Sequence, residues 1–293
     1  MNRHTAELLL LAALWGASFL FMRVAAPEFG PVVMIALRVG IAVLALAPFV
    51  AFDPVARAEI RAAWKPLLVV GISNSALPFC MFGYSMLYLN AGFDAILNAT
   101  TPLWTAAIAA IWFRTRLTRA AVLGLVLGIV GVGALLSDTL RLASASIPSA
   151  IGAVLIATLS YGFAANYSKR HLGAVRPMTV AFASMGFATL LLAVPALLTL
   201  PGAPVSVRAW GATILLGLLC TGLAYVIYFR LIAHVGAAQA ASVTFLIPIF
   251  GMIWGAVFLG ERVTALMIAG CMVILLGAAL ITGRIRLPQT RSV

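Results

Sequence analysis

Three prolines lie about half-way along strongly apolar stretches: Pro78, Pro102 and Pro248. Inside a helix, a proline deprives the carbonyl four residues earlier of its usual N–H donor. The carbonyls freed in this way are those of Asn74, Asn98 and Thr244. In hydrocarbon such a carbonyl must be satisfied within the protein or in a wet cavity. Each break is therefore either a kink satisfied by a nearby Ser or Thr, or part of a polar cavity that binds a solute. Because there are three of them, we expect a cavity near the membrane midplane.

Polar and aromatic side chains collect in the same apolar stretches. The candidate binding residues, freed carbonyls included, are Trp15, Asn74, Pro78, Tyr84, Asn98, Thr101, Pro102, Trp104, Tyr161, Tyr225, Thr244 and Pro248. A lone Trp or Tyr in such a sequence is otherwise an interfacial anchor or a packing residue. We give that reading to the aromatics at the ends of the stretches, which are Trp64, Tyr88, Trp112 and Trp210.

Charged residues are sparse within these stretches. Arg38 lies about seven residues into the second one, where it either extends toward the membrane surface or pairs internally. Glu7 and Asp94 lie near the ends of theirs, and none of the stretches has a carboxylate in its middle. Cys80, Cys220 and Cys271 lie in apolar runs and read as small buried residues. No metal or cofactor site is predicted.

The composition requires a membrane. Hydrophobic residues make up 64% of the chain and charged residues 9%, whereas soluble domains carry about 25% charge. Ten runs are long enough to cross a bilayer, so we predict an all-α polytopic protein whose first run spans the membrane and is not a cleaved leader. The predicted spans are 7–26, 31–51, 66–89, 92–113, 119–137, 148–168, 176–199, 209–231, 237–259 and 264–283, and the loop 52–65 has room for a short interfacial helix.

The basic residues predict the orientation. The net charge of +12 comes from residues between the apolar runs, which indicates cytoplasmic loops facing anionic lipid and argues against nucleic acid. With both termini in the cytoplasm, most of the basic residues fall on that side. They are Arg3, Arg57, Arg61, Lys65, Arg114, Arg116, Arg119, Lys169, Arg170, Arg176, Arg230, Arg284, Arg286 and Arg291. Arg23, Arg38, Arg141, Arg208 and Arg262 remain for the other side or for span interiors.

The two halves of the chain repeat one another. TTPLWTAAIAAIWFRTRLT at Thr100–Thr118 aligns without a gap with LIPIFGMIWGAVFLGERVT at Leu246–Thr264, 146 residues later. The same register aligns Trp15-Gly16 with Tyr161-Gly162, and further Pro, Trp and Gly pairs across five spans. Since five is odd, the second half must enter the membrane from the opposite side, as in the inverted repeats of secondary transporters. We therefore predict repeats at 1–146 and 147–293.

The glycine-rich fifth and tenth spans have a different character. Gly124 and Gly131, and their counterparts Gly270 and Gly277, lie seven residues apart on one helix face and permit close packing. These spans otherwise hold almost only aliphatic residues. We expect a scaffold, or a contact with a second copy in a homodimer.

These features resemble the drug/metabolite transporter superfamily, EamA type. The resemblance covers the whole chain and includes Trp15-Gly16-x-Ser18, the mid-span Pro102 and Pro248, and Gly260-Glu261-Arg262. In the first half, Arg114-Thr115-Arg116 stands at the position equivalent to Gly260-Glu261-Arg262 and has no acidic residue. We therefore interpret Glu261 as a loop or helix-end feature. Within the superfamily the chain is most similar to bacterial exporters of aromatic amino acids. That implies a bacterial inner-membrane protein that exports small amino acids by alternating access.

Other functions stay open at this point. The cargo could instead be cationic drugs, sugars or other metabolites, and a channel is compatible with an inverted repeat. An enzyme is disfavoured, because the sequence has no His-Glu-x-x-His, no paired Asp in facing spans and no Gly-x-Ser-x-Gly. Without fixed carboxylates or lysines in the cavity, we expect neutral amino acids as cargo and facilitated diffusion as the mechanism.

Overall fold

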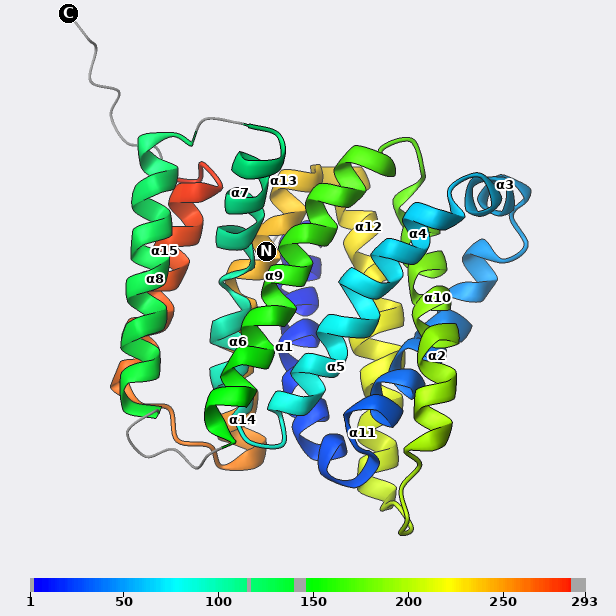
Figure 1. Ribbon diagram of the computed structural model, residues 1–293, viewed down its shortest axis with the longest axis horizontal. Helices are drawn as coiled ribbons and strands as arrows, with labels where there is room; N and C mark the ends of the chain where they lie inside the picture. Colours follow the sequence, from blue (N-terminus) through cyan, green and yellow to red (C-terminus); the bar gives the residue numbers. More distant parts are fainter. Residues whose placement is uncertain (1–2, 115–116, 140–145, 286–293) are drawn as a thin grey trace, which may run out of the picture.

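The computed structural model describes residues 3–114, 117–139 and 146–285, and every regular element in these ranges is helical (Figure 1). The predicted positions of Arg116, Arg141, Arg286 and Arg291 lie outside the described residues.

Within the described residues, eight helical stretches are long and apolar enough to cross a membrane. Four are single helices in the first and middle parts of the chain: α1 (Arg3–Phe29), α2 (Pro31–Val50), α8 (Arg119–Thr139) and α9 (Ile147–His171). A fifth single helix is α10 (Pro177–Leu198). The other three are composite: α4 (Trp64–Gly71), η1 (Ile72–Ala76) and α5 (Leu77–Ser85); α6 (Ala91–Asn98) and α7 (Thr101–Trp112); α11 (Val207–Gly217), η2 (Leu218–Leu223) and α12 (Ala224–Val235). The chain is thus a multi-pass membrane protein.

The last two predicted spans are built from shorter elements. The span expected at 237–259 is divided into α13 (Ala237–Ala240), the 3-10 turn η3 (Ala241–Phe245) and α14 (Ile247–Leu259). The span expected at 264–283 is α15 (Ala265–Ile281). The loop expected to hold a short helix does so, as α3 (Pro54–Ala62), whose first turn is capped by Asp53 accepting from Val55 N at 2.8 Å.

The interruptions predicted at Pro78, Pro102 and Pro248 coincide with changes of helix type, and a π turn that was not predicted, η2, lies in a span without a proline. The π turns η1 and η2 begin 146 residues apart, at Ile72 and Leu218, and α7 and α14 begin 146 residues apart, at Thr101 and Ile247. Pro78, Pro102 and Pro248 all lie in the first turn of α5, α7 and α14. A proline fits there because its missing N–H would have no partner in any case.

Glycines set the closest approaches between helices. A Cβ on Gly124 of α8 would lie 2.5 Å from the carbonyl oxygen of Gly277 of α15, and a Cβ on Gly131 would lie 3.2 Å from that of Gly270. These contacts hold α8 and α15 side by side at one edge of the molecule, while α2 packs against α10 toward the other (Figure 1). The two glycine-rich spans therefore pack on each other, as their spacing allows.

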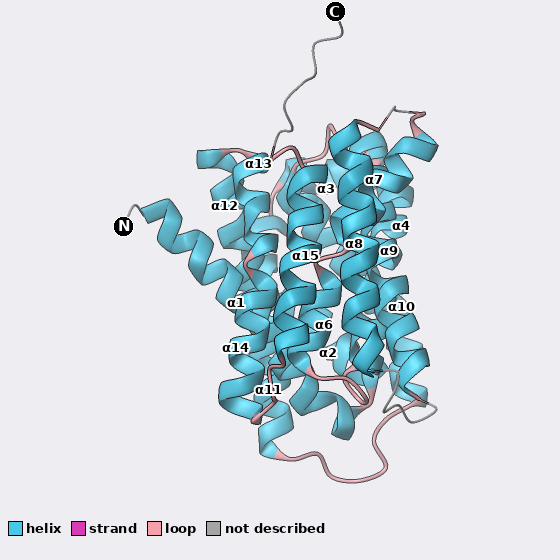
Figure 2. Cartoon of the chain, turned by 90° about the vertical axis from the view of Figure 1, so that its left-hand side faces the viewer, coloured by secondary structure: helices cyan, strands magenta, loops and turns pink. Residues whose placement is uncertain are grey.

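The molecule has two distinct ends. One end carries α3 and α13, and the other carries the start of α11 and the end of α14 (Figure 2). At the first end Arg176 bridges Asp53 at 2.8 Å and Glu59 at 3.1 Å, and its hydrogen bond lowers the pKa of Asp53. At the second end Glu28 accepts from the backbone N–H and hydroxyl of Ser206, both at 2.7 Å. These contacts join the first half of the chain to the second at both ends.

Candidate functional site

Trp15 of α1 lies against two tyrosines of α12. Its ring centroid is 6.1 Å from that of Tyr225 and 5.2 Å from that of Tyr228. Gly16 allows this position, because a Cβ there would lie 2.6 Å from the Cβ of Phe250 in α14. The glycine after Trp15 thus brings α1 close to α14 while the indole faces α12.

The second half of the chain repeats this arrangement with the first half as its partner. Tyr161 of α9 lies 6.4 Å from Phe79 and 6.1 Å from Phe82 of α5, measured between ring centroids. Gly162 would place a Cβ 2.9 Å from the Cβ of Trp104 in α7. Positions 146 residues apart are equivalent in the two halves. Trp15 is thus equivalent to Tyr161, and Tyr225, Tyr228 and Phe250 are equivalent to Phe79, Phe82 and Trp104. The sequence prediction missed Phe79 and Phe82, although the repeat register points to them as counterparts of Tyr225 and Tyr228.

Arg38 of α2 lies close to members of both aromatic groups. Its side chain is buried, with the residue 5% exposed, and its guanidinium carbon is 3.8 Å from the centroid of the Phe79 ring. Nε donates to the Thr221 hydroxyl at 3.0 Å, and a terminal nitrogen lies 3.6 Å from the Met22 sulfur. The sequence left Arg38 either extending toward the membrane surface or pairing internally. In the structure its side chain pairs internally, and its partners are neutral groups.

The π turn η2 positions the hydroxyl that meets Arg38. Gly217 lets the chain approach closely, since a Cβ there would lie 2.9 Å from the backbone oxygen of Arg38. Thr221 then donates to the carbonyl of Leu216 at 2.9 Å, so its oxygen is oriented to accept from Arg38. The π turn η2 therefore places a hydrogen-bond acceptor, the Thr221 hydroxyl, beside Arg38.

Further polar groups complete this cluster. The Asn74 side chain lies beside Tyr225, and both Tyr225 and Tyr161 lie close enough to the guanidinium to interact with it electrostatically. We define the Arg38 cluster as Trp15, Arg38, Asn74, Phe79, Tyr161, Thr221 and Tyr225. Of the predicted site residues, Trp15, Asn74, Tyr161 and Tyr225 are therefore brought together, from α1, η1, α9 and α12.

The break between α6 and α7 forms a second group of predicted residues. The carbonyl of Asn98, freed by Pro102, accepts from the Thr101 hydroxyl at 2.8 Å. This is the first of the two alternatives, a kink whose carbonyl is satisfied by a nearby Thr. Trp104 follows one turn later, and its buried indole N–H has no hydrogen-bond partner in the part of the chain that the structure describes. Asn166 of α9 donates to the carbonyl of Thr105 at 2.9 Å and holds α7 in place.

The other predicted residues are Tyr84, Thr244, Pro248 and Pro78. Tyr84 hydrogen-bonds Ser149 at 3.0 Å, at the start of α9. Thr244 is exposed and donates to the carbonyl of Ala241 at 2.8 Å, while Pro248 and Pro78 are buried in the first turns of their helices.

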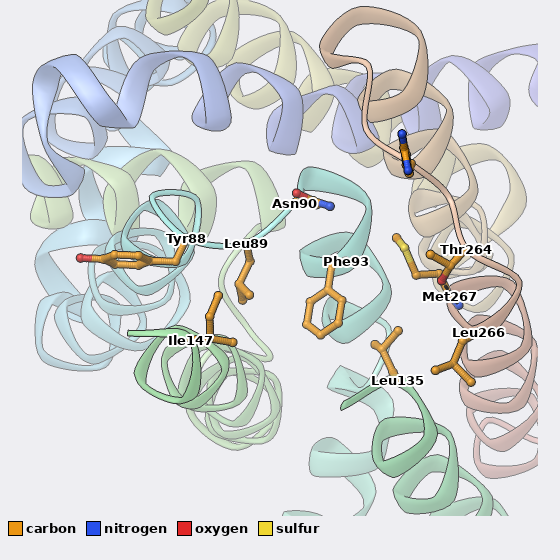
Figure 3. A pocket seen from close by; sticks show the side chains of 10 residues that line it. Tyr88, Leu89, Asn90, Phe93, Leu135, Ile147, Thr264, Leu266 and Met267 are labelled. Atoms are coloured by element: carbon orange, nitrogen blue, oxygen red, sulfur yellow. Dashed lines mark hydrogen bonds between the residues drawn. The ribbon is translucent and has the colours of Figure 1, made fainter. Parts of the chain in front are cut away.

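Two cavities open near the end of the molecule opposite α3. One, of about 270 Å³, lies between the start of α6 and the start of α15, where Figure 3 shows Asn90 and Phe93 flanked by Ile147 and Met267. The other, of about 790 Å³, is lined by charged residues that include Arg23, Glu28 and Glu261. Within the described ranges, no group of His, Cys, Asp or Glu side chains is arranged to hold a metal ion.

Glu261 and Asp94 hold the structure together beside these cavities. The Glu261 carboxylate accepts from the backbone N–H groups of Ala91 and Gly92, at 2.9 and 3.2 Å, and so caps α6. This confirms the helix-end interpretation of Glu261. Asp94 is fully buried and accepts from the Ser85 hydroxyl, while Arg23 donates to the carbonyl of Met86.

Known proteins resemble this chain along its whole length. A probable amino-acid metabolite efflux pump of Salmonella typhimurium is 26% identical over 92% of this chain and 91% of its own. A probable terminal-alkyne amino-acid exporter of Streptantibioticus cattleyicolor is 25% identical over 97% and 95%. A chain of known crystal structure shares the fold with a TM-score of 0.62, at 19% identity over 95% and 96% of the two chains. The sequence profile of one family matches residues 6–137 and again residues 148–283. The chain belongs to the EamA-like transporter family.

Proposed function

We propose that this protein is a secondary transporter that exports small neutral and aromatic amino acids, or closely related metabolites, by alternating access. Membership in a transporter family supports transport, and two similar proteins are described as exporting amino acids or their metabolites. The Arg38 cluster supplies aromatic walls, an amide, hydroxyls and a cation, which suit the body and the polar head of an amino acid.

The proposed mechanism rests on one observation: each half of the chain makes the same contacts with the other half at equivalent positions. Trp15 of the first half contacts Tyr225 and Tyr228 of the second, and the 146-residue shift turns these contacts into those of Tyr161 with Phe79 and Phe82. The glycine contacts exchange in the same way, because Gly71 approaches Ser184 just as Gly217 approaches Arg38. This pattern supports ten spans arranged as inverted repeats, 1–146 and 147–293, around one central site.

The orientation follows from the same symmetry and from charge. The end that carries α3 also carries Arg57, Arg61 and Lys65 in α3 and at the start of α4, and Lys169 and Arg170 at the end of α9. The positive-inside rule favours this end for the cytoplasm. The protein would then lie in a bacterial inner membrane with its described N-terminal helix entering from the cytoplasm.

Radiolabelled amino-acid counterflow in proteoliposomes containing only this protein tests the proposal. We expect saturable uptake of labelled phenylalanine that is stimulated by unlabelled phenylalanine inside the vesicles. Flux without counterflow would indicate a channel instead. Counterflow of sugars or cationic drugs without amino acids would keep the mechanism and change the cargo.

The oligomeric state is a separate part of the proposal. The exposed faces of α8 and α15 include Ile129 and Met272, at 70% and 64% exposed. Such a face lies against lipid or against a second copy in a homodimer. Cross-linking of single cysteines at these two positions in membranes would distinguish the two arrangements.

A further inference from the structure

Among the described residues, the guanidinium of Arg38 is a buried cation without an acidic partner. Its contacts are the Thr221 hydroxyl, the Met22 sulfur and the Phe79 ring. Over the described part of the chain, none of the ion pairs involves Arg38. A buried ionised group is costly unless it is paired, so this position calls for an anion that the described chain does not supply.

We propose that Arg38 binds the carboxylate of the transported solute, so that the site takes solutes with a single carboxylate on an apolar or aromatic body. The inference deepens the proposed transport function and rests on it. A guanidinium offers a fork of N–H donors that matches a carboxylate. The Met22 sulfur is a weak acceptor, so a carboxylate oxygen that replaces it improves the pairing of Arg38.

The surroundings of Arg38 define the rest of the solute. The Trp15 and Tyr225 rings, 6.1 Å apart, and the Phe79 and Tyr161 rings, 6.4 Å apart, provide apolar surface near Arg38. A ligand ammonium can meet the aromatic faces and the Tyr225 hydroxyl, whereas a solute that lacks the ammonium still satisfies the arginine.

The repeat explains why only one carboxylate fits. The position equivalent to Arg38 in the second half is Ser184, and the position equivalent to Thr221 in the first half is Ser75. Both serines are buried. The equivalent place in the other half is therefore neutral. A second carboxylate, as in glutamate, would have no cation to meet there, and we expect acidic amino acids to be carried poorly.

The test compares acids with their amides on the purified protein. In proteoliposomes, phenylalanine and 3-phenylpropionate should inhibit labelled phenylalanine counterflow more strongly than phenylalaninamide. The difference should be at least about tenfold, the size expected when a charge-assisted hydrogen bond is lost. The same ligands should raise the melting temperature of the detergent-solubilised protein in the same order.

Variants then assign this preference to Arg38. Arg38→Gln should abolish the preference for acid over amide, Arg38→Lys should retain part of it, and Arg23→Gln, which alters another arginine in a span, should retain all of it. Equal inhibition by acid and amide in the unaltered protein would overturn the inference, and this comparison requires no variant to fold. A full acid preference in Arg38→Gln would overturn it as well.

The outcomes separate this inference from the proposed function. If phenylalanine shows no counterflow but 3-phenylpropionate stabilises the unaltered protein and not Arg38→Gln, the amino-acid cargo is wrong and the carboxylate site stands. If phenylalanine counterflow occurs and amides compete equally, the transport function stands and the carboxylate site is wrong. If neither phenylalanine nor 3-phenylpropionate stabilises the protein or inhibits flux, the carboxylate site is wrong.

Discussion

At the scale of single residues, Trp15 and Tyr161 test whether the two halves share one site. Each contacts two rings of the opposite half, and both belong to the Arg38 cluster. We expect Trp15→Ala and Tyr161→Ala to change the relative counterflow rates of phenylalanine, leucine and alanine, because each change removes an aromatic ring of the proposed binding site. Competition assays in proteoliposomes measure this directly.

Trp210 provides the control for this prediction. It lies at the start of α11, half-exposed, with its ring edge-on to Phe29 at 4.9 Å between centroids. Trp210→Ala should lower expression or the melting temperature and leave the order of substrates unchanged. An altered substrate order in Trp210→Ala, with none in Trp15→Ala, would contradict the division into cavity and interfacial aromatics.

The sequence predicted the candidate site only in part, for physical reasons. Trp15, Asn74, Tyr161 and Tyr225 stand out because polar and amphipathic residues are unusual in the middle of a span. Phe79 and Phe82 do not, because a phenylalanine in a membrane helix looks the same whether it lines a cavity or packs against lipid. The surroundings of Arg38 depend on Thr221 and Met22, which come from other spans, so no local pattern predicts them.

At the scale of elements, the proline-started helices α7 and α14 break spans that would otherwise be continuous. The Asn98 carbonyl accepts from Thr101, so the break is satisfied internally and can persist in an apolar environment. Pro102→Ala and Pro248→Ala restore an N–H and favour a continuous helix. We expect both variants to insert normally and to lose most counterflow activity, and Asn98→Leu and Thr244→Val to behave in the same way.

The matched control is Pro195→Ala, which alters an exposed proline inside α10. It should leave counterflow close to that of the unaltered protein. Normal transport in all four break variants would show that the breaks have only a structural role.

The contact between α8 and α15 leads to an element-scale prediction about stability. Gly124 and Gly133 both lie in α8, but only Gly124 faces α15, where a Cβ would lie 2.5 Å from the backbone oxygen of Gly277. A Cβ on Gly133 would meet nothing within 4 Å. Gly→Ala in a helix otherwise stabilises by about 0.5–1 kcal/mol, so Gly133→Ala should preserve or raise the melting temperature. Gly124→Ala should lower it, and equal melting temperatures would contradict the importance of this contact.

Hydropathy predicted the elements better than their internal breaks. The eight long spans lie within a few residues of their predicted limits, because a long apolar run has few other stable forms in a membrane. The sequence predicts one span over 237–259 with a break at Pro248, and the structure adds the 3-10 turn η3 at Ala241–Phe245 before that proline. Pro248 marks the start of α14, whereas the 3-10 turn before it has no equally clear sequence signal.

At the scale of the whole molecule, the orientation of the two halves is open to direct measurement. Cys80, Cys220 and Cys271 are the native cysteines and would first be replaced by alanine. A single cysteine at Lys169 should then react with a membrane-impermeant maleimide only from the cytoplasmic side, and one at Arg208 only from the outside. A cysteine at Arg61 in α3 serves as a second cytoplasmic probe. Arg61 and Arg208 lie at nearly equivalent positions of the two halves, so if they react from the same side, the inverted repeat is wrong.

The energy source is the last whole-molecule property that the charge distribution predicts. Proton-driven transporters commonly use a titratable carboxylate or histidine along the solute path, and arginine keeps its charge at working pH. Glu7 interacts with Arg3 and Arg230 at the end of the molecule that carries α3, while Asp94 is buried beside Ser85 near the other end. Neither belongs to the Arg38 cluster, so we expect facilitated diffusion driven by the gradient of the solute. A pH step across proteoliposomes without a phenylalanine gradient should then cause no accumulation. Accumulation that a protonophore abolishes would reject facilitated diffusion, and its loss in Glu7→Gln or Asp94→Asn would identify the proton carrier.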